Sequence, residues 1–195
     1  MKIIAITTPR VTDNDAPIIS ALLDRGIATI HLRKPESTID ECRRVLELLT
    51  SAQRSRIIIH DYPELYSEFG LCGIHLNRNI TQYPNNYDGH RSRSCHTLEE
   101  VAKYRGENDY LFLSPIFDSI SKQGYKAAFS HEVLQQASDA GIIDERVIAL
   151  GGVTLDRLPY LKSLKFGGAA MMGAIYSAEI IEQHSTMEAL IEATR

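Results

Sequence analysis

The chain has 195 residues, of which 44% are hydrophobic and 24% are charged, and this composition excludes a disordered chain, a collagen-like chain and a coiled coil. The net charge is -4, so we expect no nucleic-acid partner, and no apolar run approaches the roughly 20 residues that would predict a membrane partner. Three cysteines without paired spacing, behind an N-terminus that does not resemble a secretory signal, predict reduced thiols in a cytoplasmic protein.

Short apolar runs recur along the chain with polar stretches between them. Several of these runs are continuous rather than alternating, which is typical of strands that are buried on both faces. The predicted strands are residues 3–7, 28–32, 56–59, 73–76, 92–95, 110–113, 147–150 and 168–172.

Amphipathic patterns predict helices between most of these strands. Two of the helices begin with a capping box, formed by Thr38 with Glu41 and by Thr97 with Glu100. Residues 77–90 are rich in Asn, Pro and Gly, which predicts a loop in place of a helix. The predicted helices are residues 16–23, 38–49, a stretch from 97 onward, 131–140, 155–164 and about 186–193.

Alternating strands and helices predict a parallel sheet, and their number favours an α/β fold of the closed (β/α)8 TIM barrel type. We expect one such domain over residues 1–195, with two small domains as the alternative to one. The alternative fold is an open doubly wound sheet. Its glycine-rich fingerprint is missing, because Thr8-Pro9-Arg10 follows the first strand.

Polar residues gather where the predicted strands end, which is where a parallel barrel places its active site. Asp61 is a carboxylate at such an end, and one carboxylate is a weak signal for Mg²⁺. His96 has the chemistry of a general acid or base, although a helix-start residue would look the same. The other candidates at the second, third and fifth strands are His31, Arg33, Lys34, His60 and Ser94.

The ends of the last three predicted strands suggest anion binding. Gly151-Gly152 and Met172-Gly173 each join a strand to a helical stretch, and backbone amides at such junctions bind phosphate. The alternative is that the glycines only make tight turns. Ser119, Ser121 and Lys122 form a polar loop after the sixth strand that suits a phosphate or pyrophosphate, or that is simply solvated.

In these motifs the chain resembles the thiamin phosphate synthase (thiamin phosphate pyrophosphorylase) and TenI family over nearly its full length. The resemblance implies a (β/α)8 barrel and a small-molecule phosphate substrate. The matching stretches are residues 30–33, 59–61, 73–76, 94–97, 113–117, 119–122 and 149–154.

The synthases of this family join a pyrimidine diphosphate to a thiazole phosphate and release pyrophosphate with Mg²⁺. The resemblance then implies that Asp61 binds the metal, while Arg33, Lys34 and Lys122 stabilise the departing pyrophosphate. The positions that match the family pattern are Arg33, Asp61, Ser94, Ser121, Lys122, Gly151, Gly152, Met172 and Gly173, the last two by their turn rather than by identity.

Several positions depart from the synthase pattern. His31 replaces a glutamine, Pro35 a lysine and His60 an asparagine, and Ile80 stands where a second metal-binding aspartate is expected. Each lost charge-assisted contact costs on the order of 1.5–3 kcal/mol. The pyrophosphate half of the site is therefore expected to be weaker than the thiazole phosphate half.

These departures favour a TenI-like thiazole tautomerase, in which His96 moves a proton and no cofactor is needed. The alternatives are a synthase that requires Mg²⁺, a non-catalytic binder of thiazole phosphate, and an unrelated phosphate-binding barrel. Under each of the family alternatives, thiazole phosphate is an expected ligand, and the synthase also binds a pyrimidine diphosphate. The sequence does not decide whether the chain forms a homo-oligomer.

Overall fold

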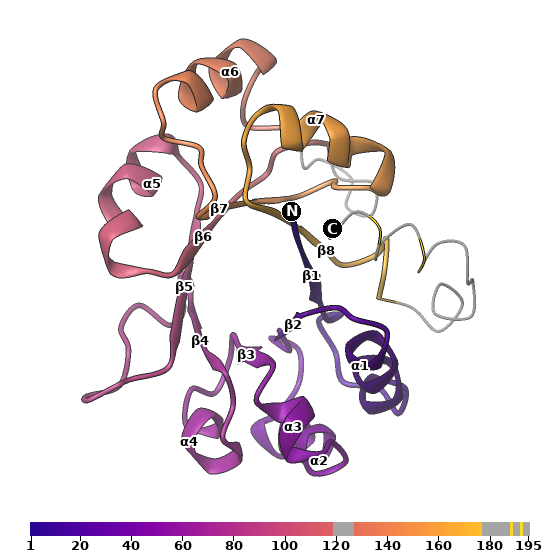
Figure 1. The fold of residues 1–195 in the computed structure, drawn as a ribbon. Coiled ribbons are helices and arrows are strands. Elements are labelled where there is room, and N and C mark those ends of the chain that lie inside the picture. Colours follow the sequence, from indigo (N-terminus) through magenta and orange to yellow (C-terminus); the bar gives the residue numbers. More distant parts are fainter. Residues whose placement is uncertain (119–126, 177–187, 189–191, 193–195) are drawn as a thin grey trace.

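A computed structural model describes residues 1–118, 127–176, 188 and 192. Eight parallel strands pair in chain order, and β1 closes on β8, so the sheet is a barrel rather than an open layer (Figure 1). The predicted TIM barrel is therefore confirmed. Its strands are β1 (Lys2–Ile6), β2 (Thr29–Leu32), β3 (Ile57–Ile59), β4 (Gly73–Leu76), β5 (His90–Cys95), β6 (Tyr110–Leu113), β7 (Val147–Leu150) and β8 (Gly168–Met171).

Helices surround the barrel (Figure 1). They are α1 (Asp15–Asp24), α2 (Ile39–Glu47), α3 (Ser51–Arg54), α4 (Leu65–Phe69), α5 (Leu98–Tyr104), α6 (His131–Asp139) and α7 (Leu158–Ser163), with short 3-10 turns η1 (Arg105–Glu107) and η2 (Leu155–Arg157). The helix expected at residues 155–164 therefore begins as a 3-10 turn. Sequence analysis missed the short helices α3 and α4, and the helix expected at 186–193 lies outside the described residues, save for two positions.

The two capping predictions have different outcomes. Thr38 and Glu41 form the complete capping box at the start of α2. The Thr97 hydroxyl accepts a hydrogen bond from Glu100 N at 3.2 Å. The Glu100 carboxylate, however, accepts from His96 N at 2.6 Å instead of closing the box.

The connection from β4 to β5 contains no helix, as its composition predicts, and it projects between α4 and α5 (Figure 1). Tyrosines take over part of the covering role of a helix here. The rings of Tyr83 and Tyr87 stack with centroids 4.8 Å apart, and the Tyr87 hydroxyl accepts a hydrogen bond from Ile74 N at 2.6 Å. Gly73 permits close strand contact, since a Cβ there would lie 2.2 Å from His90 O.

Inward-facing side chains divide the barrel interior into two halves. The apolar half consists of Ile4 and Ile6 of β1, Ile148 of β7 and Ala170 of β8, all buried, and its cluster extends to Ile58 of β3 and to the rings of Tyr110 and Phe112 of β6. The polar half consists of His31, His60, His75, Ser92, Ser94 and the Tyr110 hydroxyl, which come from β2, β4, β5 and β6 and from the position after β3. Among the described residues no helix combines the length and the apolar character that crossing a bilayer requires.

Candidate active site

Asp61 lies at the carboxyl end of the barrel, two residues after β3 ends. Its Oδ2 accepts a hydrogen bond from Lys34 N at 2.9 Å, which fixes the carboxylate beside the end of β2. A cavity of about 350 Å³ opens here, and Asp61, Tyr62, Asn79 and Ile80 line part of it. Asp61 is thus accessible to a small ligand at the mouth of the barrel.

The oxygen donors around Asp61 are suited to Mg²⁺ that is shared with a substrate. Asn79 lines the same cavity and carries an amide oxygen. The side-chain oxygen of Asn77 is already engaged, because it accepts from Asn79 N at 2.8 Å and Ile80 N at 3.1 Å. Mg²⁺ is commonly held by one or two carboxylates together with substrate phosphates, and Asp61 with Asn79 fits that arrangement.

Arg33 extends from the end of β2 and is half-buried. Its backbone is fixed by the Thr7 hydroxyl, which donates to Arg33 O at 3.0 Å and accepts from Arg33 N at 2.9 Å. The guanidinium charge helps to lower the pKa of His60 and of His75 beneath it. No carboxylate of the described residues pairs with this guanidinium, so it is available to an anion.

Lys34 does not lie where the pyrophosphate role requires it. Successive strand side chains point to opposite sides, so Arg33 faces the mouth and Lys34 faces α1. The Lys34 ammonium is buried and pairs with Asp15 at 2.6 Å, and it also donates to Arg10 O at 3.0 Å. The Tyr176 hydroxyl donates to the same carboxylate at 2.5 Å. Burial lowers the pKa of Lys34 although Asp15 opposes that shift.

His96 follows β5 directly and is exposed at the mouth. Its Nδ1 lies 3.1 Å from Ser114 O and 3.4 Å from the Ser114 hydroxyl, and the shorter contact, to a carbonyl acceptor, favours the tautomer with the hydrogen on Nδ1. Nε2 is then a free lone pair, and no described residue contacts it through a hydrogen bond. This arrangement is suited to accepting a proton from a bound molecule.

The turn after β7 requires glycine at two successive positions. Gly151 and Gly152 have φ values of +94° and +61°, and a Cβ on Gly152 would lie 2.3 Å from Asp118 O. Next to it is the turn after β8, because β7 pairs with β8 up to Leu150 and Ala170. A Cβ on Gly173 would meet nothing within 4 Å. Within the described ranges, no group accepts a hydrogen bond from the amides of Gly152 or Gly173.

Three further predicted binding residues point into the barrel interior instead of the mouth. His31 is fully buried, and its Nδ1 and Nε2 bond to His60 Nε2 at 2.6 Å and to the Tyr110 hydroxyl at 2.5 Å. The Ser94 hydroxyl bonds to His75 Nε2 at 2.8 Å. His31 is thus enclosed by barrel side chains, whereas contact of substrate with His60 and with half-buried Ser94 stays a prediction.

The remaining predicted residues have mixed positions. The Met172 side chain packs against the apolar half, so only its backbone belongs to the turn after β8. Ser119, Ser121 and Lys122 lie outside the described residues. Sequence reasoning gave no role to Tyr110, Ser92 and Tyr176, whose hydroxyls complete the buried contacts. Tyr110 and Phe112 are two positions apart on β6 and therefore lie on the same face of the strand, which was the available signal for an inward-facing tyrosine.

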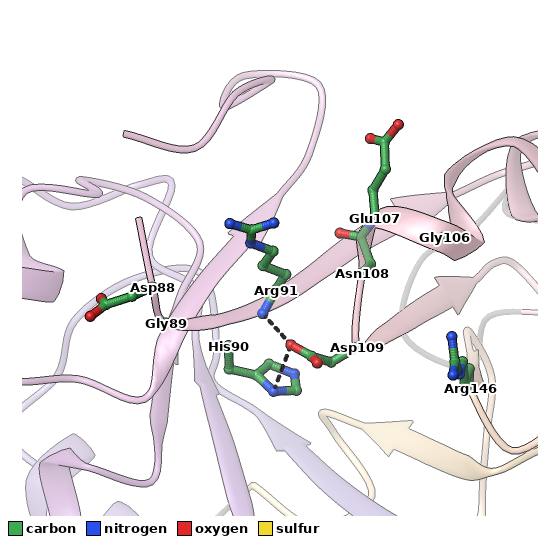
Figure 2. A pocket seen from close by; sticks show the side chains of 9 residues that line it. All are labelled: Asp88, Gly89, His90, Arg91, Gly106, Glu107, Asn108, Asp109 and Arg146. Carbon is green, nitrogen blue, oxygen red and sulfur yellow. Dashed lines mark hydrogen bonds and ion pairs between the residues drawn. The ribbon is translucent and has the colours of Figure 1, made fainter. Parts of the chain in front are cut away.

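A larger cavity lies at the opposite, amino-terminal end of the barrel and has a volume of about 580 Å³ (Figure 2). His90 begins β5 there, and its Nδ1 lies 3.4 Å from the Asp109 carboxylate, which also accepts from Arg91 N at 2.8 Å. Residues at the amino-terminal end of such a barrel usually contribute to its stability, whereas the catalytic residues lie at the carboxyl end. We therefore place the active site at the smaller cavity.

Comparisons with known proteins agree with the barrel fold. The thiamine-phosphate synthase of Rhodospirillum centenum is 26% identical over 185 residues, which cover 88% of each chain. The crystal structure of a thiamine phosphate pyrophosphorylase from Bacteroides thetaiotaomicron superposes with a TM-score of 0.87 at 36% identity and covers 100% of both chains. A thiamine phosphate pyrophosphorylase from Pyrococcus furiosus, with a TM-score of 0.77 and 17% identity, shows the fold alone.

The names of these relatives do not support the preference for a tautomerase, and they agree better with the synthase alternative. The family model described as thiamine monophosphate synthase matches residues 3–175, which is nearly the whole described barrel. On this match and on the relatives, the chain belongs to the thiamine monophosphate synthase (TMP-TENI) family and is an enzyme of that family.

Proposed function

We propose that this enzyme is a thiamin phosphate synthase, which joins a pyrimidine diphosphate to a thiazole phosphate and releases pyrophosphate. The observation that carries the proposal is that two separate groups of residues at one barrel mouth have chemistry suited to phosphate groups. Asp61 and Arg33 lie over β2 and β3, whereas the glycine turns follow β7 and β8. Two phosphorylated substrates need two such ends, and a tautomerase with one phosphorylated substrate needs one.

The pyrophosphate end consists of Asp61 with Asn79 and of Arg33. Asp61, with Asn79 beside it, would hold Mg²⁺, and the bound ion would supply positive charge opposite the leaving pyrophosphate. Arg33 holds a second part of the same group, since a guanidinium with no carboxylate partner in the described part of the chain can form two parallel hydrogen bonds to phosphate oxygens. We propose that Ser119, Ser121 and Lys122, which lie outside the described residues, bind the same group.

The thiazole phosphate end consists of backbone amides. The free N–H groups of Gly152 and Gly173 are proposed to bind the phosphate, as amides at strand-to-helix junctions do. Arg157 stabilises this turn, because its Nη1 donates to Gly152 O at 2.6 Å and its guanidinium lies 4.4 Å from the centroid of the Phe117 ring. The two substrates are thus oriented toward each other across the mouth, which lowers the entropic part of the barrier.

His96 favours a second candidate, the thiazole tautomerase. Its Nδ1 is held by Ser114 O while Nε2 has no hydrogen-bond partner in the described chain. A metal-independent proton transfer would use this nitrogen and the glycine turns, and it would leave Asp61 without a catalytic role. The two candidates therefore make opposite predictions for Asp61 and His96.

The test compares Asp61→Asn, His96→Ala and a control, Asp24→Asn, which changes an exposed aspartate at the far end of α1. A synthase loses at least about 100-fold in kcat in Asp61→Asn, since the metal loses its charged ligand, and Asp24→Asn retains full turnover. Turnover of a thiazole phosphate tautomer that persists in Asp61→Asn and in EDTA, but not in His96→Ala, would overturn the synthase proposal in favour of the tautomerase.

A further inference from the structure

Three histidines of the polar half converge inside the barrel. His31 comes from β2, His60 follows β3 and His75 comes from β4, so neighbouring strands hold all three. One ring nitrogen of each lies within 4.8 Å of the others, and all three side chains are buried. The rings of His60 and His75 stack with centroids 4.1 Å apart.

Burial disfavours a positive charge on the three imidazoles. It is the main cause that lowers the pKa of His31 and His60, and it lowers the pKa of His75 to about 3. The neutral imidazole is the form that donates a lone pair to a metal ion.

The outer nitrogens of two rings are already held. Tyr110 binds His31 Nε2 at 2.5 Å, and Ser92 binds His75 Nδ1 at 2.8 Å. Metal-binding histidines nearly always have such a partner on the nitrogen that faces away from the ion. These contacts leave His31 Nδ1, His60 Nε2 and His75 Nε2 for a shared ligand.

The facing nitrogens need one rearrangement to accept an ion. His31 Nδ1 and His60 Nε2 share a hydrogen bond of 2.6 Å, whereas two nitrogens on one tetrahedral Zn²⁺ lie about 3.3 Å apart. The hydrogen of that bond first moves to the outer nitrogen of its own ring, and a small ring rotation then replaces the hydrogen bond with two metal–nitrogen bonds. The Ser94 hydroxyl, 2.8 Å from His75 Nε2, is the group that the ion displaces.

We propose that His31, His60 and His75 form a binding site for a divalent transition-metal ion of the Zn²⁺ class. The nitrogen-only donor set of the described residues distinguishes this site from the oxygen site at Asp61, because imidazole suits Zn²⁺, Co²⁺ and Ni²⁺ and carboxylate suits Mg²⁺. The inference does not rest on the proposed function. An ion here joins β2, β3 and β4 and stabilises the polar half.

The experiment titrates untagged, metal-free protein with Zn²⁺ and with Co²⁺. We expect one Zn²⁺ per chain with a Kd below about 10 μM, an absorption spectrum of tetrahedral Co²⁺, and no competition from Mg²⁺. His60→Ala should weaken binding by more than about 100-fold and Ser92→Ala by about 10- to 100-fold, since the second removes only an outer partner. The control His131→Ala changes an exposed histidine and should bind like the unaltered chain.

A wild-type chain that binds no Zn²⁺ below this limit would overturn the proposal, and this outcome does not depend on any variant folding. Binding that His60→Ala and Ser92→Ala leave unchanged would also overturn it, because the ion would then lie elsewhere. If His60→Ala does not fold, the Co²⁺ spectrum of the wild type and the effect of Ser92→Ala decide. Synthase activity in Mg²⁺ is a separate readout, so failure of one proposal leaves the other open to its own test.

Discussion

The two halves of the barrel interior are filled in different ways, one by apolar side chains and the other by hydrogen-bonded polar side chains. The apolar half fills its space with Ile4, Ile6 and Ile148, which need no partners. The polar half buries His31 and His75, whose ring nitrogens all have hydrogen-bond partners. Above the apolar half are the backbone amides of the glycine turns, and above the polar half are the charged side chains of Arg33 and Asp61.

The comparison indicates that the two halves differ in how they respond to pH and to substitutions. A buried polar network is stable only when each member is satisfied, so one lost partner affects several others. An apolar layer responds to a change only locally, through lost contacts and a cavity. We therefore expect the polar half to be sensitive to pH and to single substitutions, and the apolar half to be tolerant of both.

The largest expected effect is loss of stability in acid. The folded-state pKa values of His31, His60 and His75 are lowered, so their contribution is present above the unfolded value of about 6.5 and is lost as the pH falls below it. Lowering the pH from about 7.5 to about 5.5 should cost about 1–2 kcal/mol for each histidine, or about 4 kcal/mol together. Urea unfolding at the two pH values measures this difference.

The matched variant for this measurement is His75→Gln, which retains hydrogen-bonding groups and removes one titratable group. Its loss of unfolding free energy between the two pH values should be smaller by about 1–2 kcal/mol. An unfolding free energy that is the same at both pH values in the unaltered chain would contradict the account of the polar half.

The second effect is expected from removing a network member without a polar substitute. His75→Leu leaves the hydroxyls of Ser92 and Ser94 without their partner. Each unsatisfied buried group costs about 1–3 kcal/mol, so the unfolding free energy should fall by about 2–4 kcal/mol. Equal stability of His75→Leu and the unaltered chain would show that the network contributes nothing.

The third effect separates two glycines of the phosphate end. Gly152→Ala places a Cβ 2.3 Å from Asp118 O at a φ of +61°, so we expect a loss of at least about 2 kcal/mol and of thiazole phosphate binding. Gly173→Ala has open space around the new Cβ and should change the unfolding free energy by less than about 0.5 kcal/mol. Thermal unfolding of both variants distinguishes the two positions, and similar values would contradict the geometry.

The smallest effect is expected in the apolar half. Ile148→Val removes one buried methylene from a layer of apolar side chains and should cost about 1 kcal/mol. The cost should be the same at about pH 7.5 and about pH 5.5, because Tyr110 and Cys72, the titratable groups of this cluster, have raised pKa values and stay protonated at both. A strong pH dependence of this cost would show that the two halves are coupled.

The sequence predicts the barrel well because each strand carries its own local signal. The continuous runs at β1, β6 and β7 are strands, and the loop between β4 and β5 follows from its Asn, Pro and Gly content. The start of β5 was placed two residues late, since His90 and Arg91 are not apolar. Their strand pairing comes from Gly73 and Ile74 on the neighbouring strand.

The candidate site is predictable only in part, for a physical reason. Residues at strand ends can be found from the sequence, and this identified Asp61, Arg33 and the glycine turns. Strand alternation also separates Arg33 from Lys34, but the partner of Lys34 is Asp15, on a different element. Which inward-facing side chains meet depends on barrel closure, so the contact of His31 with Tyr110, 79 positions away, has no local signal.

The most direct measurement is an assay of the unaltered enzyme with the pyrimidine diphosphate and the thiazole phosphate, in Mg²⁺ and in EDTA, with each substrate omitted in turn. The account predicts thiamin phosphate and pyrophosphate in equal amounts, only when both substrates and Mg²⁺ are present. Conversion of a thiazole phosphate alone, at the same rate in EDTA, with no pyrophosphate released under any condition, would contradict it.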